Sequence, residues 1–337
     1  MNYIGLDVHS LNFTMAHLNQ QGRLCRIYER PTSAYNLIDV VGKVSGPKAL
    51  VVEECHLAQW VKHTLEVYVD QLVVCDPKRN KWICGDDFAN DKTSAIKLAK
   101  LLLGGFIKAI YHGDDEAATL RSLFLHYFDC NRQVTRFKNK VKSTFRQVAI
   151  RPAGGGIYDP QSRQVWLDQL QGFPHLVAQA EHWFNLLEHL QITKDEAYAQ
   201  MVPRARRLPV YKHLLLMPGV GPVIATGYIA MLDTPHRFSR KNKLWRYAGL
   251  GNCYHESDGT AYKDRPSKSG NRALKWVVMQ HYHAAMRCKE SNRFQRKQQN
   301  LLRRGLDNKT VRRHICRSLL SSVRAMWMKE EAYHDRV

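Results

Sequence analysis

The sequence predicts an α/β plus α protein, in which only the first third contains a β-sheet. Two observations support this fold class. Short runs rich in β-branched residues alternate with helix-like segments up to about residue 114. Beyond that point, apolar residues recur at three- and four-residue steps, which is typical of helices. The 337 residues are enough for two domains with sizeable cores, and the 44% hydrophobic content indicates a globular chain.

Residues 1–114 are expected to form a small α/β domain. Three strands come first, and strands and helices then alternate along the chain. This order is the one expected of an RNase H-like sheet. Strands are predicted over residues 3–8, 12–18, 24–28, 49–53, 71–75 and 107–111, and helices over residues 33–44, 56–68 and 92–103.

Residues 115–200 are expected to form a helical spacer. An apolar seam runs along its first half, and basic residues occupy the positions between the seam residues. Gly172 and Pro174 are expected to break or kink the second half. Both core helices of a bundle and a coiled coil that follows nucleic acid fit this pattern. The seam consists of Val134, Phe137, Val141, Phe145 and Val148.

Residues 201–330 are expected to form a compact helical domain. A glycine turn that includes Gly219 and Gly221 lies between two short apolar helices, as in a helix-hairpin-helix element. Glycines allow successive backbone N–H groups to face outward, and such a nest at a helix N-terminus binds phosphate. Further helices are predicted over residues 271–287, 291–304 and 308–328.

The chain carries a formal net charge of +21, from 51 Lys and Arg against 30 Asp and Glu. A surplus of this size indicates a polyanionic partner. A basic enzyme or a protein that meets anionic lipids would also fit. Nucleic acid is favoured because basic and aromatic residues are interleaved, as in the segment that contains Lys241, Lys243 and Trp245.

The compartment is expected to be the cytoplasm. The eight cysteines have neither metal-binding nor CxxC spacing, so reduced thiols are expected. No signal peptide is expected, because Asp7 interrupts the first apolar run. Residues 214–232 are uncharged and almost long enough to cross a bilayer. Prolines and glycines in the first half of this segment argue against a membrane helix, so no membrane partner is expected.

Three acids fall at positions suited to metal binding. Asp7 and Glu53 lie on predicted strands, and Asp91 opens a predicted helix. Acids on adjacent strands, completed by one from a helix, form a hard oxygen site for Mg²⁺, which assists phosphoryl transfer. Glu54 is an alternative to Glu53, because side chains alternate along a strand. Asp91 alone would be an ordinary helix cap.

Seven segments stand out along the chain. They are YIGLDVH at 3–9, VVEEC at 51–55, NDKTSAIKLAKLL at 90–102, LMPGVGPVIA at 216–225, RFSRKNKLWRYAGL at 237–250, ESDG at 256–259 and RPSKSGNRALK at 265–275. In this order they resemble the DEDD insertion-sequence transposases, the group that includes the pilin-gene invertase and the bridge-RNA-guided recombinases. The resemblance covers essentially the whole length, and its C-terminal segments are the more specific.

The resemblance assigns the first three acids of a RuvC-like DEDD site to Asp7, Glu53 and Asp91. The fourth acid falls on Ser94, which can approach Mg²⁺ but brings no charge. This departure from the family pattern predicts weaker metal binding. Asp87, one helical turn before Asp91, is an alternative source of the missing carboxylate.

The family's nucleophilic serine falls on Ser257, which the resemblance implies forms a covalent phosphoserine bond with DNA. Ser267 and Ser269 are competing serines. The segment around them is better interpreted as phosphate contacts that open a helix. The contact residues expected there are Arg265, Lys268 and Arg272.

The resemblance also implies a homo-oligomer, a dimer or a tetramer, whose active site is assembled between subunits. It implies a noncoding guide RNA that chooses donor and target DNA, which suits a protein that recognises backbone and shape. Two other functions remain open. One is a metal-dependent junction-resolving nuclease in which water attacks. The other is a catalytically weakened nucleic-acid-binding descendant, which the serine at position 94 favours.

Overall fold

The structure, a computed structural model, describes residues 1–76, 90–253, 256–257, 260–261, 265–266 and 269–335. The chain divides into two compact units, Met1–Ala118 and Thr119–Val337. The first unit is built around a β-sheet and the second is mainly helical, so the predicted α/β plus α class is confirmed.

The first unit contains a five-stranded sheet with the order β3-β2-β1-β4-β5. The strands β1, β2 and β3 are antiparallel neighbours, and β4 and β5 run parallel to β1. The first five predicted strands are therefore confirmed. They are β1 (Asn2–Val8), β2 (Asn12–Leu18), β3 (Leu24–Pro31), β4 (Lys48–Glu53) and β5 (Gln71–Cys75).

The sixth predicted strand, residues 107–111, is wrong. Only an isolated antiparallel bridge joins Ala109 to Cys75 of β5. The pairing ends there because the following residues turn toward the helix α2 (Ala58–Leu65). His112 contacts Gln59 of that helix, and Lys62 Nζ donates to the Gly113 carbonyl oxygen at 2.8 Å. The chain beyond this bridge is therefore held by side chains of α2 and does not continue pairing with β5.

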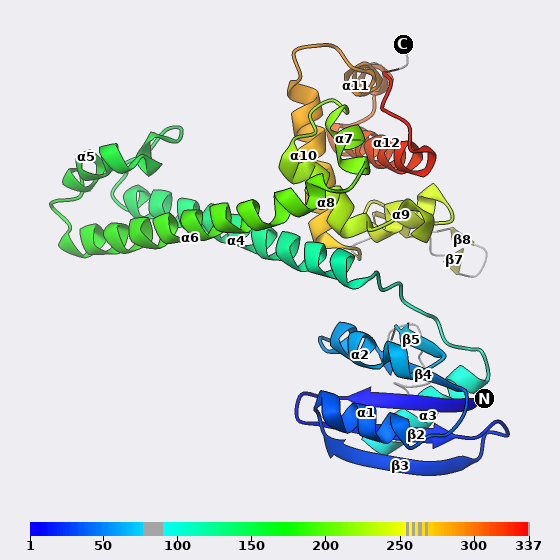
Figure 1. Ribbon diagram of the computed structural model, residues 1–337. Helices are drawn as coiled ribbons and strands as arrows, with labels where there is room; N and C mark the ends of the chain where they lie inside the picture. The colour runs from blue at the N-terminus through cyan, green and yellow to red at the C-terminus, as the bar shows by residue number, and fades with distance from the viewer. Residues whose placement is uncertain (77–89, 254–255, 258–259, 262–264, 267–268, 336–337) are drawn as a thin grey trace. The chain divides into compact units, whose positions relative to one another are not determined.

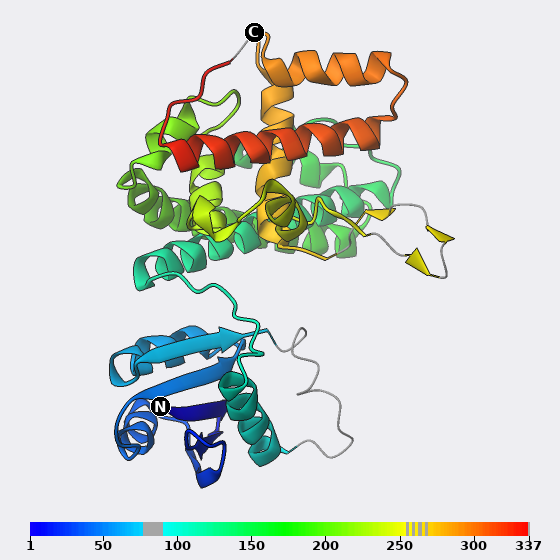
Figure 2. The same ribbon diagram turned by 90° about the vertical axis from the view of Figure 1, so that its right-hand side faces the viewer.

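Helices cover both faces of this sheet (Figures 1 and 2). The helix α1 (Ala34–Gly42) and α2, followed by the 3₁₀ turn η1 (Glu66–Tyr68), pack on the face that carries Ile4 and Leu6. The helix α3 (Asp91–Leu103) packs on the other face, against Val51 and Cys75. Alternation along β1 therefore directs Gly5 and Asp7 toward α3.

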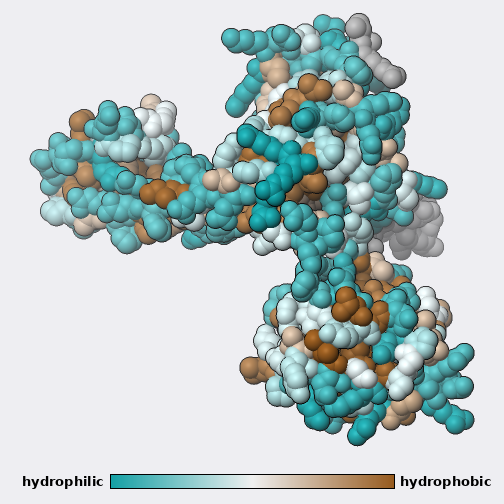
Figure 3. Space-filling view, in the orientation of Figure 1, coloured by the Kyte–Doolittle hydropathy of each residue, from teal (hydrophilic) through white to brown (hydrophobic). Residues whose placement is uncertain are grey.

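Two long helices, α4 (Asp115–Arg146) and α6 (Pro174–Arg206), run antiparallel in the second unit (Figure 1). Apolar contacts join the end of α4 to the start of α6, and the start of α4 to the end of α6. Between them lie η2 (Gly156–Tyr158), η3 (Pro160–Ser162) and α5 (Arg163–Asp168). The exposed surface of the pair is largely hydrophilic (Figure 3).

The predicted break near Gly172 and Pro174 is confirmed, because α5 ends at Asp168 and α6 begins at Pro174. The helix α6 then continues beyond residue 200 and contributes Met201 and Ala205 to the C-terminal core. The division of this unit into a spacer and a C-terminal domain stays a prediction.

The helix α8 (Pro222–Leu232) is buried from Ala225 to Leu232 and packs against α6, α10 (Arg272–Arg287) and the short helix that precedes it. The short helix α7 (Val210–Leu215) precedes the glycine turn. The other elements are η4 (Pro235–Arg237), α9 (Lys241–Tyr247), α11 (Arg293–Arg303) and α12 (Asn308–Lys329). Among the described residues, no helix is both long enough and apolar enough to cross a membrane.

A buried histidine links the glycine turn to two helices. His281 of α10 accepts a hydrogen bond from the Tyr228 hydroxyl at Nδ1 (2.8 Å) and donates from Nε2 to the Pro218 carbonyl oxygen (3.2 Å). The carbonyl oxygen can only accept, so Nε2 carries the proton. Burial lowers the pKa of His281 from 6.5 to about 4, and the imidazole is therefore neutral near pH 7.

This arrangement predicts a loss of stability in mild acid. The folded state binds the His281 proton less tightly than the unfolded chain, so stability is full above pH 6.5 and falls as the pH drops toward about 4. We expect the free energy of unfolding, measured with urea, to fall by on the order of 3 kcal/mol across that range because of this residue. The variant His281→Gln should lose this part of the pH dependence.

The control is His175→Gln, which changes an exposed histidine of α6 and should keep the wild-type pH profile. An unchanged pH dependence in His281→Gln would contradict the assignment of a neutral buried imidazole.

Candidate active site

Two acids lie side by side at the end of the parallel strands β1 and β4. The register pairs Leu6 with Val52, so Asp7 and Glu53 are the next residues along the two strands. Leu6 and Val52 face the core beneath α1 and α2. Their neighbours Asp7 and Glu53 therefore face α3.

Direct backbone packing between α3 and β1 determines where Asp91 lies. A methyl group at Gly5 would lie 2.0 Å from the Ala95 carbonyl oxygen and 2.6 Å from the Ala99 nitrogen. Only glycine allows this approach. Asp7 is two residues beyond Gly5 on the same face of β1, and Asp91 is one helical turn before Ala95. The close contact at Gly5 thus places both carboxylates together.

The start of α3 is capped, which holds Asp91 in place. The Asn90 side chain accepts a hydrogen bond from the Thr93 backbone N–H at 2.8 Å. Asp91 is therefore the first helical residue, where the helix dipole stabilises a carboxylate.

His9 completes a group of three potential ligands. Its Nε2 atom lies 3.2 Å from Asp7 Oδ1 and 3.8 Å from Asp91 Oδ1. One ligand atom from each of the three residues lies within 4.8 Å of the other two. Carboxylate oxygens with one imidazole nitrogen are a donor set that divalent cations accept.

The two strand acids are poorly solvated and repel each other. Burial raises the pKa of Asp7; nearby His9 opposes this shift, and Asp91 adds to it. Burial also raises the pKa of Glu53, the negative charge of Asp7 raises it further, and His9 opposes the shift. A nearby cation would offset both the burial and the repulsion.

Glu53 and Glu54 have different surroundings. The Glu53 Oε1 atom is buried and has no hydrogen-bond partner among the described residues. Glu54 is exposed and forms an ion pair with His112. A buried carboxylate oxygen without a partner is costly, and a bound cation is one way to satisfy it. The residues present therefore fit a divalent metal ion.

Of the two candidates for a fourth metal ligand, the structure describes Ser94 but not Asp87. Ser94 lies half-buried on α3, and its backbone N–H donates to Asn90 O at 2.9 Å. Asp87 lies outside the described residues.

Ser257 lies in a short hairpin of the second unit. The strand β7 (Glu256–Ser257) pairs with β8 (Thr260–Ala261), and β6 (Asn252–Cys253) pairs with β9 (Arg265–Pro266). We call residues 249–270 the serine hairpin. The backbone of Ser257 is described, while its side chain lies outside what the structure describes.

The two ends of the serine hairpin are held together at Gly249 and Gly270. A methyl group at Gly270 would lie 2.4 Å from the Gly249 nitrogen, and both glycines have positive φ. Asn271 strengthens this junction, because its backbone N–H donates to Tyr247 O at 2.6 Å and its side chain donates to the Tyr247 hydroxyl at 3.1 Å. From α12, Arg317 Nε donates to Leu250 O at 2.8 Å.

The residues predicted to contact nucleic acid lie on several elements of the second unit. Lys241 and Lys243 are exposed on α9, and Arg272 is exposed as the first residue of α10. The backbone of Arg265 lies in β9. Lys268 lies outside the described residues.

The glycine turn has a packing function. A methyl group at Gly219 would lie 2.4 Å from the Ala285 nitrogen of α10, and Gly219 has a φ of +79°. The Val220 N–H is engaged with Met217 O at 3.0 Å. Gly221 has extended backbone and open space around its Cα. A phosphate contact at these glycines stays a prediction.

Sequence reasoning missed His9 as a site residue. The signal was present, since His9 follows Asp7 by two residues just beyond the end of β1. Side-chain alternation continues over that distance and would have placed both residues on one face.

The family of the second unit follows from comparison with known proteins. Residues 211–299 match a model of insertion-sequence transposases. Its description is the Transposase IS116/IS110/IS902 family, and this part of the chain is similar to that family. The matched segment contains the glycine turn, α9 and the serine hairpin, and the match confirms the transposase resemblance of the motifs that lie within it. No curated protein matches the chain.

The packing at Gly5 predicts that a single methyl group disturbs the acidic site. Gly5→Ala should push α3 away from β1 and separate Asp91 from Asp7, because the Ala95 carbonyl oxygen occupies the space. We expect a loss of stability of about 1–3 kcal/mol in thermal or urea unfolding and weaker Mn²⁺ binding in calorimetry. The control is Gly46→Ala, which has open space around its Cα but a positive φ. It should cost stability through backbone strain and leave Mn²⁺ binding unchanged.

The raised pKa values of Asp7 and Glu53 predict a cation-dependent stability. The folded state holds the protons of these two carboxyl groups more tightly than the unfolded chain does. The two groups therefore stabilise the fold most below their unfolded pKa values, and this stabilisation is lost as the pH rises through their raised pKa values in the folded protein. At pH 7 the charged acids therefore destabilise the metal-free protein. Glu53→Gln should therefore raise the melting temperature without divalent cations. It should also reduce the stabilisation that Mg²⁺ or Mn²⁺ gives to the wild type. Glu54→Gln is the matched control and should keep the full cation response.

Proposed function

We propose that the chain is an insertion-sequence transposase that cuts and rejoins DNA by means of Ser257 and the acidic group Asp7, Glu53 and Asp91. The family of residues 211–299 supports the transposase class. The observation that carries the catalytic part of the proposal is the convergence of Asp7, Asp91 and His9. Glu53 lies beside Asp7 on the neighbouring strand, with its Oε1 atom buried and unpaired among the described residues.

The sheet supports a RuvC-like, RNase H-like assignment of the first unit. Three antiparallel strands followed by two parallel strands, in the order β3-β2-β1-β4-β5, is the arrangement expected from the strand pattern of that fold. The acids lie at the end of the central strands and at the start of α3, where this fold carries its metal ligands in the proposed family.

Asp7, Glu53 and Asp91 would hold Mg²⁺, with His9 or Ser94 at its edge. A cation bound there supplies positive charge to a phosphate that gains negative charge during the reaction. The protein's own part is to hold the carboxylates in place, through the strand register and the contact at Gly5, and to keep them partly buried. Ser94 brings no charge, so a site of moderate metal affinity is expected.

Ser257 would act as the nucleophile. Its Oγ atom loses its proton and attacks a phosphorus atom of the DNA backbone, which forms a phosphoserine ester and releases the sugar oxygen of the broken bond with a proton. Attack by a hydroxyl of another DNA end reverses these steps, rejoins the strand and frees the serine. The anchored base of the serine hairpin at Gly249 and Gly270 supports this role.

We further propose that the chain works in the cytoplasm as a homo-oligomer with Mg²⁺, DNA and a noncoding guide RNA. In this proposal the acids of one subunit and the serine hairpin of another form one active site. The net charge of +21 supports a nucleic-acid partner.

The test is a plasmid assay with the ends of the element, in which covalent protein–DNA adducts and recombined products are measured. Ser257→Ala should abolish adducts, and Asp7→Ala should reduce products by about a thousandfold or more, because each removes a group that takes part in the reaction. Ser267→Ala, Ser269→Ala and Glu54→Gln are the matched controls and should retain activity.

Other outcomes would identify a different function. Mg²⁺-dependent cleavage without adducts, unchanged in Ser257→Ala, would make the protein a nuclease in which water attacks. DNA binding without any cleavage or joining, unaffected by Asp7→Ala, would make it a non-catalytic nucleic-acid-binding protein.

A further inference from the structure

A hollow of about 400 Å³ lies between α11 and α12 in the second unit. Basic side chains of α11 and hydroxyl groups of α12 face each other across it. The polar lining residues are Arg293, Lys297, Ser318, Ser321 and Ser322.

Hydrogen bonds hold this lining in place. Lys297 Nζ donates to Ser318 Oγ at 3.2 Å, and Arg293 donates from its guanidinium group to Ser322 Oγ. The hydroxyl group of Ser321 accepts from Trp245 Nε1 of α9 at 3.0 Å. Each basic side chain is therefore held at a serine, with further N–H groups left to donate to a ligand.

The positive charges around the hollow repel one another. Although Lys297 is exposed overall, partial burial of its ammonium group, followed by the charges of Arg293 and Lys241, lowers its pKa. Burial also lowers the pKa of His314 on α12, and the charges of Arg317, Lys297 and Arg313 lower it further. No carboxylate is among the described residues that line the hollow.

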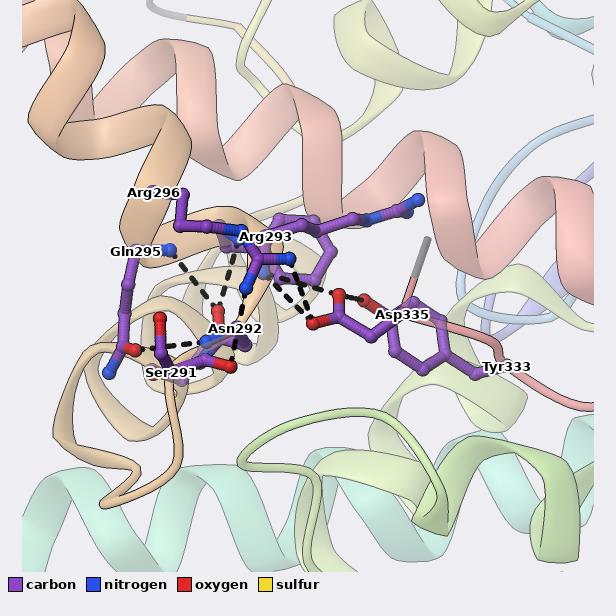
Figure 4. Close-up of polar contacts among 9 residues, drawn as sticks. Ser291, Asn292, Arg293, Gln295, Arg296, Tyr333 and Asp335 are labelled. Atoms are coloured by element: carbon purple, nitrogen blue, oxygen red, sulfur yellow. Dashed lines mark hydrogen bonds and ion pairs between the residues drawn. The ribbon is translucent and has the colours of Figure 1, made fainter. Parts of the chain in front are cut away.

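Asp335, an acid that contacts the start of α11, is engaged elsewhere. Asp335 accepts from the Arg293 backbone N–H at 3.2 Å, from Arg296 at 3.2 Å and from the Tyr333 hydroxyl at 2.8 Å. Figure 4 shows this acid at the start of α11, next to Arg296 and Tyr333. Asp335 therefore binds groups at the start of α11 and in the C-terminal segment. The guanidinium group of Arg293 stays hydrogen-bonded to Ser322.

We propose that the hollow between α11 and α12 binds a phosphate group of a nucleic-acid strand. A phosphate accepts hydrogen bonds on several oxygens, which suits an arginine, a lysine and serine hydroxyl groups that face one space. Its negative charge would also remove the repulsion among Lys241, Arg293 and Lys297.

A strand is a better ligand than a free phosphate because hydrogen bonds connect the helices that line the hollow to α9 and to the serine hairpin. Trp245 joins it to α9, which carries Lys241 within 5.7 Å of the indole ring. Arg317 of α12 joins it to Leu250 at the base of the serine hairpin. A strand bound here would therefore lie on the helices that support this hairpin. This inference rests on the proposed function.

The test is the salt dependence of binding to a fluorescein-labelled DNA duplex of arbitrary sequence. Log affinity falls with log salt, and each phosphate contact adds about 0.9 to the steepness of that fall. Lys297→Gln should reduce the steepness by about one. Lys329→Gln, which removes the same charge from a lysine of α12 paired with Glu331 at 3.7 Å, should leave it nearly unchanged.

A second measurement separates the two sources of phosphate. Inorganic phosphate, compared with chloride at equal ionic strength, should raise the melting temperature of the wild type and of Lys329→Gln more than that of Lys297→Gln. If this difference appears while the DNA slope is the same for all three proteins, the hollow binds free phosphate and the strand assignment is wrong. If neither measurement separates Lys297→Gln from Lys329→Gln, the whole inference is overturned.

The adduct assay distinguishes this failure from failure of the proposed function. If adducts depend on Ser257 but Lys297→Gln leaves the salt dependence of DNA binding unchanged, the transposase proposal stands and the phosphate site in the hollow is wrong. If Lys297→Gln weakens the salt dependence but the wild type forms no adduct, the phosphate site stands and the serine mechanism is wrong.

Discussion

The acidic site depends on the direct contact between the backbones of β1 and α3 at Gly5. Because no side chain separates them, the carbonyl oxygen of Ala95 can lie where a methyl group would be. The start of α3 is thereby held over the end of β1, and Asp91 and Asp7 approach the same His9 nitrogen. The parallel register adds Glu53 from the neighbouring strand. Backbone packing, more than any side-chain contact, sets this geometry.

The molecule has two places where like charges gather at a cost in stability. In the first unit, burial and mutual repulsion raise the pKa values of Asp7 and Glu53. In the second unit, burial and neighbouring cations lower the pKa of Lys297. Such clusters persist where a ligand of opposite charge offsets them, and perturbed groups of this kind gather at functional sites. A cation for the first and a phosphate for the second agree with a protein that acts on nucleic acid.

The second unit illustrates how buried contacts support the base of the serine hairpin. Neutral His281 ties α8 and α10 to the glycine turn, and the close approach at Gly219 packs that turn against α10. The serine hairpin leaves this framework at Gly249 and returns at Gly270, where the two backbones touch. A rigid base of this kind reduces the conformational freedom that a reacting group must lose, which favours a role in positioning.

The sequence by itself determined most of the elements, because periodicity and turn residues act locally. Helix boundaries such as the break before Pro174 were predictable for this reason. Residues 107–111 were not, since the residues that follow them contact α2 and the pairing with β5 stays an isolated bridge. Side-chain alternation places His9 on the same face as Asp7. Only the tertiary structure decided that Glu53 faces α3 while Glu54 pairs with His112, and that Asp91 approaches His9. These two outcomes depend on which sheet face each helix covers and on contacts between residues far apart in the chain, and no local pattern encodes them.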